Sequence, residues 1–415
     1  MQQTIMGLVG VVSVMLLALV LSENRRAIKL RTVLGALAIQ AGLGLLVLYI
    51  PWGQAMLLAM TEGVQAVIDS AQAGMDFLFG GLVSDKMFEL FDGGGFVFAL
   101  RVLPIVVFFS SLISVLYYLG IMRWIIKLLG GALHRLLHTS RTESLSAAAN
   151  IFVGQTEAPI VVRPFLASMT RSELFAVMVG GLASVAGSVL GGYAAMGISL
   201  EYLLAASFMA APGGLLMAKM IIPETETREQ TVEEVIEDSA TDKPANVIEA
   251  AAVGASSGVQ LAINIGGMLL AFIALIALAN AMLGWVGGLI GYGDVTLELL
   301  LGYLFSPLAF LIGVPWEEAI QAGSFIGQKI VLNEFVAFAD LAVQQEALSP
   351  HAQAIVVFAL CGFANLSSIA ILMGGLGIMA PNRRSDIARM GLKAVAAGTL
   401  SNLMSAALAG LFLSL

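Results

Sequence analysis

The chain has 415 residues, of which 59% are hydrophobic and only 12% are charged, and its mean hydropathy is +0.94. Soluble domains carry about 25% charged residues, so this composition excludes a soluble protein. Apolar runs long enough to cross a bilayer predict a polytopic membrane protein. The net charge of −8 carries no information about nucleic acid, because the acidic residues concentrate in 224–249, and no nucleic-acid partner is expected. The single cysteine, Cys361, excludes an intramolecular disulfide.

Apolar runs predict an all-α protein with eight transmembrane helices. They lie at about 4–21, 32–50, 96–120, 173–196, 201–222, 257–283, 353–379 and 388–414. Basic residues cluster in the loops 23–31, 121–141 and 380–393, and loops of this kind face the cytoplasm. The alternation therefore places both termini outside the cytoplasm. It also predicts external surface helices in 54–95 and an amphipathic helix on the cytoplasmic surface after residue 120.

Two stretches, 142–170 and 317–345, are too rich in polar residues to be ordinary spans. The first contains GQTEAP at 154–159, and the second contains Asn333 and Glu334 between apolar arms. Each is predicted to be a re-entrant hairpin of two short helices, because irregular backbone is tolerated at membrane depth only inside protein or beside a cavity. The alternation of the loops predicts that the two hairpins enter from opposite faces.

Each hairpin precedes a helix that is interrupted by small and polar residues. The interruptions lie in VGGLASVAGSVLGG at 179–192 and in LCGFANLSSIAILMGG at 360–375. A hairpin followed by a discontinuous helix thus occurs twice, in opposite orientations, which indicates an inverted repeat. Proteins of this kind bind their solute and coupling ion near the midplane, where the helix breaks converge.

Glu157 and Glu334 are the leading candidates for function within these stretches. An ionised carboxylate at bilayer depth costs at least about 2.5–3.5 kcal/mol, so an intramembrane acid usually has a functional role. A structural alternative remains for Glu157, which could pair with Arg163. The nearby Asn and Ser side chains either bind the solute or hydrogen-bond neighbouring helices.

The chain resembles the concentrative nucleoside transporter family, in its bacterial branch, through a series of motifs. They are, in chain order, GQTEAPIVVRPF, GGLASVAGSVLGGY, SFMAAPGGLL, LNEFVAF and CGFANLSSIAI. The resemblance runs from the first span to the C-terminus and departs slightly at Leu332. It implies a homotrimer of eight-span protomers, each with a scaffold part and a mobile transport part that holds both hairpins. It also implies cation-coupled nucleoside uptake by an elevator-type movement.

The resemblance implies a role for individual residues. It implies that the nucleobase binds Gln155, Thr156 and Glu157, and that the ribose hydroxyls bind Glu334, Asn365 and Ser368. It implies apolar contacts of the substrate with Phe363, Val189 and Leu261. It implies a sodium site made by the side chains of Asn150 and Ser184 and by the carbonyls of Val153 and Val185. Such a polar set suits a nucleoside, because its many donors and acceptors need partners when they are buried.

The predicted organisation has five parts. Residues 1–120 form mainly scaffold spans and external surface helices, and 121–222 form the interfacial helix, the first hairpin and the first broken helix. Residues 223–256 form an acidic cytoplasmic linker, and 257–300 form a scaffold span and an external connection. Residues 301–415 form the second hairpin, the second broken helix and the last span. The regions 121–222 and 301–415 together make the transport part.

The leading hypothesis is an importer of nucleosides such as uridine in the bacterial inner membrane, surrounded by lipid and driven by a sodium gradient. No cofactor other than this ion is expected. Coupling to protons through Glu334 or Glu157 is the alternative mechanism. An intramembrane enzyme with paired carboxylates as general acid and base is the competing class. The sequence disfavours it, because no nucleophile–base arrangement accompanies the repeats. It also disfavours a channel, because so many specific donors suit binding followed by release.

Overall fold

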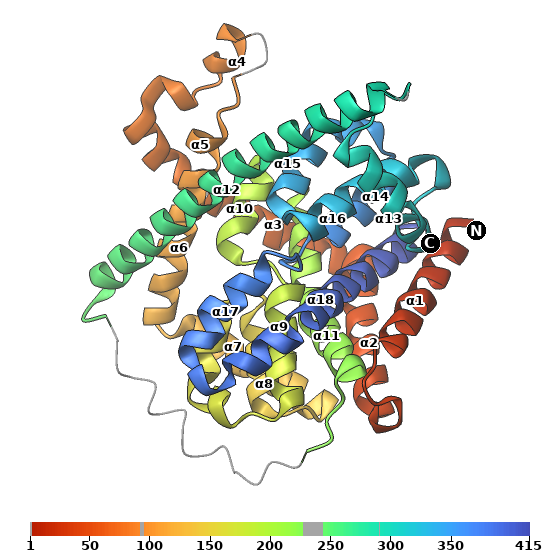
Figure 1. Ribbon diagram of the computed structural model, residues 1–415. Coiled ribbons are helices and arrows are strands. Elements are labelled where there is room, and N and C mark those ends of the chain that lie inside the picture. Colours follow the sequence, from red (N-terminus) through yellow and green to blue (C-terminus); the bar gives the residue numbers. More distant parts are fainter. Residues whose placement is uncertain (1, 92–94, 227–243, 290) are drawn as a thin grey trace.

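The computed structural model describes residues 2–91, 95–226, 244–289 and 291–415, in which every regular element is a helix (Figure 1). The helices of the first half are α1 (Gln2–Val20), α2 (Leu30–Leu48), α3 (Pro51–Phe79), α4 (Lys86–Leu90), α5 (Phe98–Arg101), α6 (Leu103–Tyr118), α7 (Ile121–Leu137), α8 (Arg141–Ala149), the 3-10 helix η3 (Ala158–Ser168), α9 (Arg171–Ala183), α10 (Gly187–Ala195) and α11 (Leu200–Ile221). Those of the second half are α12 (Val247–Leu289), α13 (Leu297–Leu311), α14 (Trp316–Val331), α15 (Glu334–Gln344), α16 (Pro350–Leu360), α17 (Ser368–Met379) and α18 (Arg384–Leu413).

The helices form a buried centre and an apolar exterior. In the membrane-length windows of α9 with α10, of α11 and of α18, 94% of the residues are buried, whereas the corresponding share in α12 is 17%. The exposed side chains of α12 include Ile263, Leu270 and Leu278. An exterior of this kind is stable in lipid rather than in water. Among the described residues, seven segments are long and apolar enough to cross a membrane, or eight if the bent pair α13 and α14 is counted as one. The prediction of an all-α polytopic membrane protein is confirmed.

The long helix α12 packs along α6 through small residues (Figure 1). A Cβ added at Gly254 would lie 2.6 Å from the Cβ of Ser114, and one added at Gly258 would lie 2.7 Å from the Cα of Val107. Small residues four positions apart let two helix backbones approach closely in a membrane. The motif GASSG at 254–258 is therefore a helix-packing motif.

Both predicted helix interruptions are present. α9 ends at Ala183 and α10 begins at Gly187, while α16 ends at Leu360 and α17 begins at Ser368. The seventh predicted span, 353–379, is therefore two short helices joined by an irregular segment. Each broken helix follows a pair of short helices, α8 with η3 and α14 with α15, whose members pack against each other. We call these pairs the first and the second hairpin.

Two predicted boundaries and one predicted connection differ from the structure. α12 begins at Val247, inside the predicted linker 223–256, because the side chain of Asn246 accepts a hydrogen bond from the amide of Glu249 (2.9 Å) and caps the helix. Residues 227–243 of that linker lie outside the described residues. α13 occupies part of the predicted external connection, since Thr296 caps it by accepting a hydrogen bond from the amide of Leu299 (3.1 Å). In 54–95, for which surface helices are predicted, the long helix α3 extends to Phe79 and the short helix α4 follows at Lys86–Leu90.

Candidate functional site

The turn of the first hairpin is held against the first helix break. Ser140 and Glu143 form a reciprocal cap that starts α8, and Asn150 follows the last helical residue. The residues 150–157 then form the turn before η3 begins. Within this turn the carbonyl of Phe152 accepts a hydrogen bond from the amide of Gly187 (2.9 Å). The break between α9 and α10 frees that amide, so the interruption of the helix supplies the bond that fixes the turn.

The second hairpin places its acid at a helix start. The side chain of Asn333 accepts a hydrogen bond from the amide of Val336 (2.9 Å) and caps α15, of which Glu334 is the first residue. The carbonyl of Ile330, in the last turn of α14, accepts a hydrogen bond from the amide of Leu366 (3.1 Å). The second hairpin is thus held against the second helix break, as the first hairpin is held against the first.

The two helix breaks meet each other directly. The amide of Phe363, in the second break, donates to the carbonyl of Ser184, in the first (3.1 Å). Gly181 lets the first hairpin approach this point, since a Cβ there would lie 2.8 Å from the Cβ of Gln155. The breaks and both hairpin turns therefore converge in one buried region, as the repeat predicts.

Four predicted substrate residues form one chain of hydrogen bonds across this region. Gln155 Nε2 donates to Ser368 Oγ (3.4 Å), and the amide of Ser368 donates to Asn365 Oδ1 (2.9 Å). Asn365 Nδ2 donates to Glu334 Oε2 (2.9 Å), and Tyr193 donates its hydroxyl hydrogen to Glu334 Oε1 (3.4 Å). These bonds join the first hairpin to the second through α17 and the second break, and Tyr193 connects α10 to the same carboxylate. Gln155 Oε1 is buried without a hydrogen-bond partner among the described residues.

The predicted sodium residues lie where the first hairpin turn meets the first break. Asn150 Nδ2 donates to the carbonyl of Ser146 (2.9 Å), and the hydroxyl of Ser184 donates to the carbonyl of Gly180 (2.9 Å). Each side chain thus donates one hydrogen bond to a carbonyl one helical turn earlier and keeps oxygen lone pairs free. Asn150 Oδ1 is buried with no donor recorded in the described residues. Val153 and Val185 are buried beside this turn and this break. The donor set fits a hard monovalent cation.

Glu157 lies apart from the chain of hydrogen bonds. Its carboxylate accepts from the amide of Gly154 (3.2 Å) and faces a cavity of about 430 Å³. Val153 and Ser188 line the cavity from the side of the hairpin and the break, Arg123 and Lys127 line it from α7, and Ser257 lines it from α12. Its volume lies within the range of small-molecule sites. The structure therefore does not bring Glu157 together with Gln155 and Glu334 around one point.

The remaining predicted residues are distributed around these two regions. Thr156 packs its methyl group on α17, where a Cβ added at Gly375 would lie 2.9 Å from it. Val189 is buried in α10, and Phe363 is half-buried in the second break. Leu261 is half-buried in α12, four residues beyond Ser257 of the cavity wall.

Sequence reasoning did not assign three polar residues of the buried region. Tyr193 bonds Glu334 while its ring packs 4.8 Å from the ring of Phe335. Lys329 and Asn402 bond each other (2.7 Å) beneath the breaks. Lys329 carried a usable signal, because a lone basic residue amid apolar membrane-length sequence is as costly as an acid. Tyr193 and Asn402 carried none, since neither bears a charge.

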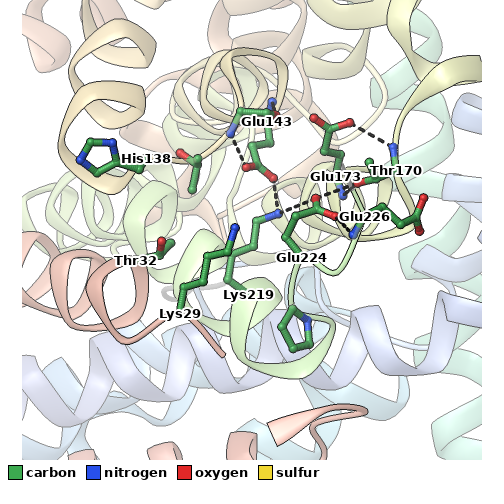
Figure 2. A pocket seen from close by; sticks show the side chains of 12 residues that line it. Lys29, Thr32, His138, Glu143, Thr170, Glu173, Lys219, Glu224 and Glu226 are labelled. Carbon is green, nitrogen blue, oxygen red and sulfur yellow. Dashed lines mark hydrogen bonds and ion pairs between the residues drawn. The ribbon is translucent and has the colours of Figure 1, made fainter. Parts of the chain in front are cut away.

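A separate polar cluster anchors the opposite ends of α8 and α9 (Figure 2). Lys219 of α11 pairs with Glu143 (2.5 Å) and donates to the hydroxyl of Ser172 (3.0 Å). The hydroxyl of Thr170, which caps α9, donates to Glu224 (2.8 Å). Figure 2 shows Lys219 and Glu143 pointing toward each other within this pocket of about 180 Å³. The cluster sets the starts of the two helices whose other ends carry Asn150 and Ser184.

Three parts of the sequence match known protein families. Residues 9–82 match the family described as "Na+ dependent nucleoside transporter N-terminus", and residues 202–410 match its "C-terminus" counterpart. Residues 99–200 match the Gate family, described as "Nucleoside recognition". These segments include both hairpins and both broken helices.

Similar whole proteins have transporter names. The nucleoside permease NupC of Helicobacter pylori is 53% identical over 99% of this chain and 98% of its own length. The sodium/nucleoside cotransporter 1 of mouse is 40% identical over 94% of this chain and 61% of its own length. The solved structure of CNTnw in an inward-facing substrate-bound state is 59% identical, covers 99% of this chain and 98% of that one, and has a TM-score of 0.95. CNTnw variants are also known in outward-facing and intermediate states.

Proposed function

Because this chain belongs to the sodium-dependent nucleoside transporter family, we propose that it imports nucleosides such as uridine across the bacterial inner membrane, driven by a sodium gradient. It is a membrane transporter and not an enzyme, since its relatives are transporters and permeases. The observation that carries the proposal is the chain of hydrogen bonds from Gln155 to Glu334, which joins both hairpins at the meeting point of both helix breaks.

In the proposed complex, the nucleoside inserts into this series of hydrogen bonds by replacing its two longest contacts. These are the 3.4 Å contacts of Gln155 with Ser368 and of Tyr193 with Glu334. Glu334, Asn365 and Ser368 would then bind the ribose hydroxyls. Gln155 and Thr156 would bind the base, with Phe363 and Val189 packing against its apolar surface. A carboxylate acceptor suits two hydroxyl donors because charge-assisted hydrogen bonds are about twice as strong as neutral ones.

We assign Glu157 and Leu261 to the wall of the path by which the substrate leaves toward the cytoplasm, and not to the direct contacts of the bound nucleoside. Glu157 faces the 430 Å³ cavity between the first hairpin, α6, α7 and α12. The cavity reaches Arg123 and Lys127 of the helix predicted to lie on the cytoplasmic surface. A nucleoside leaving toward the cytoplasm would pass this carboxylate, which can accept hydrogen bonds from the exocyclic amine of a base.

The sodium ion binds, in this proposal, between Asn150 and Ser184, with the carbonyls of Val153 and Val185. The ion would bridge the turn of the first hairpin and the first break, and it would thereby hold Gln155 and Thr156 in place for the base. By linkage, sodium must raise nucleoside affinity by the same factor by which the nucleoside raises sodium affinity. A neutral oxygen shell of this kind binds a cation but carries no titratable group for a proton.

The proposed movement is that of an elevator. α6 and α12 pack along each other and form the frame. α1 and α2, which the sequence assigned to the scaffold, pack along α18 and α11, so we assign them to the moving part together with both hairpins and both broken helices. α10 approaches α6 through glycines, since a Cβ at Gly191 would lie 2.8 Å from Ile105. A surface without side chains offers little obstruction to sliding.

We further propose that three protomers assemble, with both termini of each outside the cytoplasm. The termini are side by side, because the hydroxyl of Ser414 donates to that of Thr4 (3.1 Å). A stationary frame requires an anchor, which contacts between the frames of neighbouring protomers would supply. Native mass spectrometry in mild detergent should show three protomers. A transporting monomer would remove this part of the proposal.

Uptake into proteoliposomes tests the coupling. Radiolabelled uridine should accumulate under an inward sodium gradient, and a proton gradient imposed at equal sodium should add nothing. Ser184→Ala should weaken the sodium dependence of uridine binding. Ser207→Ala is the matched control, because its buried hydroxyl also donates to a carbonyl one turn earlier (2.9 Å) but lies in α11. Accumulation that follows only the proton gradient would establish proton coupling instead.

A further inference from the structure

Lys329 is a buried cation in the last turn of α14, close to the turn of the second hairpin. Its side chain is 1% exposed, and its ammonium donates to the carbonyl of Ala359 (3.1 Å) and to Asn402 Oδ1 (2.7 Å). Asn402 in turn donates from Nδ2 to the carbonyls of Ala183 (2.7 Å) and Cys361 (2.8 Å). One ammonium and one amide therefore connect α14 and α18 to the ends of α9 and α16.

These carbonyls need partners because the helices are broken there. In an uninterrupted helix, the carbonyl of Ala359 would accept from the amide of Phe363, but that amide donates to Ser184. Likewise the carbonyl of Ala183 would accept from Gly187, whose amide donates to Phe152. Helix C-terminal carbonyls also carry partial negative charge, which favours a cation. Lys329 supplies that cation to the end of α16.

The charge of Lys329 has no direct carboxylate partner. Within the described residues, its recorded hydrogen bonds go to the neutral groups of Ala359 and Asn402, and it forms no ion pair. Glu334 is buried (4% exposed) and interacts with Lys329 electrostatically, without a bond between them. The lysine therefore offsets the charge of Glu334 through space and leaves both carboxylate oxygens available for hydrogen bonds. An uncompensated buried carboxylate would cost far more.

We propose that Lys329 is a tethered cation that performs, at the second helix break, the role that sodium performs at the first. It holds α14 against the second break, donates a hydrogen bond to the carbonyl of Ala359 that the break leaves free, and positions Glu334 for the ribose. The second half of the site therefore always contains its cation, the ammonium of Lys329, and only the first half responds to the sodium concentration. This inference rests on the proposed function, because it takes sodium to bind at Asn150 and Ser184. Lys329 is a positioning residue and does not itself contact the substrate.

Replacement of the tethered cation by a free one tests the idea. Lys329→Ala should lower uridine affinity at least about tenfold, equivalent to about 1.4 kcal/mol. Ethylammonium chloride should restore most of the loss, whereas choline chloride at the same concentration should not, because choline is too large for the vacated space. Sodium itself should enter that space at high concentration. The sodium dependence of uridine binding should then become steeper, by one additional ion. Lys393→Ala, at a half-exposed lysine, is the control and should respond to neither salt.

A second measurement covers variants that fold poorly, and it does not require uridine. Lys329→Met should lower the melting temperature in detergent, because the charge of Glu334 is then buried without the lysine that offset it. Adding Glu334→Gln should recover part of the loss, because the second substitution removes that charge. A Lys329→Met protein with the wild-type uridine affinity and sodium dependence would overturn the proposal. So would a double variant no more stable than Lys329→Met. Failure of the wild-type protein to bind uridine would instead contradict the proposed function, while the stability comparison would still report on Lys329.

Discussion

At the scale of single residues, the groups that donate hydrogen bonds to the buried carboxylate of Glu334 differ from the group that offsets its charge. Glu334 accepts from the neutral donors of Asn365 and Tyr193, and its charge is offset by a lysine that bonds elsewhere. Asn150 and Ser184 each donate one hydrogen bond to a backbone carbonyl, which leaves their side-chain oxygens free for the proposed cation. Each buried polar group thus has an orientation that is fixed by the protein before the substrate binds. Such preorganisation raises affinity because less freedom is lost on binding.

Glu334→Gln should weaken uridine binding by about 1.5–3 kcal/mol for each charge-assisted hydrogen bond that it removes. The amide retains the shape of the side chain but loses its charge and one acceptor. Calorimetric titration at saturating sodium should show the loss, and 2′,3′-dideoxyuridine should lose little further affinity on the variant. Glu317→Gln, at an exposed position in the first turn of α14, is the matched control. Unchanged uridine affinity with altered preference among bases would move Glu334 to the base side of the site.

The residues with intramembrane charge or with recognisable motifs could be predicted from sequence, and their mutual contacts could not. Glu334, Asn365 and Ser368 were predicted to act together, and hydrogen bonds connect them. Glu157 was predicted to act beside Gln155, but the turn directs the two side chains to different regions. Adjacent residues in an irregular turn have no fixed periodicity, so sequence alone does not indicate the direction of each side chain.

At the scale of elements, the helix breaks and the hairpins depend on each other. Amides that the breaks release donate to the hairpin turn and across to the other break, as those of Gly187 and Phe363 do. The breaks could be predicted because small and polar residues interrupt apolar runs. The helix α13 was not predicted as an element, because the predicted boundary at 300 divides it: 297–300 fell in the external connection, and 301–311 fell in the part that holds the second hairpin. The first turn of α12 is also uninformative in sequence, since Glu249 belongs in composition to the acidic segment.

Two neighbouring glycines of α17 allow a matched test of the contact between α17 and the first hairpin. A Cβ at Gly375 would lie 2.9 Å from the methyl carbon of Thr156, whereas a Cβ at Gly374 would meet nothing within 4 Å. Gly375→Ala should therefore displace Thr156 and lower uridine affinity. Gly374→Ala should preserve affinity and stabilise the helix by up to about 1 kcal/mol, the usual helix-propensity difference. Equal uridine affinities of the two variants would show that this contact does not position the turn.

The cluster around Lys219 should control stability rather than binding. Lys219→Met leaves Glu143 buried without its 2.5 Å partner, a change that typically costs about 3–5 kcal/mol. The melting temperature in detergent should fall strongly. In the double variant with Glu143→Gln it should largely recover, because glutamine is neutral and still caps α8. If the double variant melts no higher than Lys219→Met, then the ion pair is not the source of the stability.

At the scale of the whole molecule, one partly exposed carboxylate connects four parts of the chain. Glu23, between α1 and α2, accepts two hydrogen bonds from Arg171 at the start of α9 (2.6 and 2.8 Å) and pairs with Lys393 of α18 (2.5 Å). Its amide donates to the carbonyl of Ile221 at the end of α11 (2.9 Å). The contacts join α1 and α2 to the buried centre, which agrees with our assignment of these helices to the moving part.

The Glu23 cluster makes stability depend on pH in a definite direction. Burial alone would raise the pKa of Glu23, but the hydrogen bonds and charges of Lys393 and Arg171 outweigh it and hold the pKa below the ordinary 4.5. A carboxyl with a lowered folded-state pKa stabilises the protein above its unfolded-state pKa, and this contribution is lost as the pH falls through the folded-state value. The three side chains are partly exposed, so solvent screening limits the contribution to about 1 kcal/mol or less.

Melting temperatures of the wild type and Glu23→Gln should therefore differ at pH 7 and converge as the pH falls below 4.5. High salt at pH 7 should reduce the same difference, because ions screen exposed pairs. Glu62→Gln, at an exposed position on α3, should follow the wild type at every pH. If the Glu23 variant also follows the wild type throughout, these ion pairs do not hold α1 and α2 against the centre. The attachment of the two N-terminal helices to the moving part would then come from the packing of α1 along α18 and of α2 along α11, together with the hydrogen bonds that the substitution leaves intact, such as that of the Glu23 amide to Ile221.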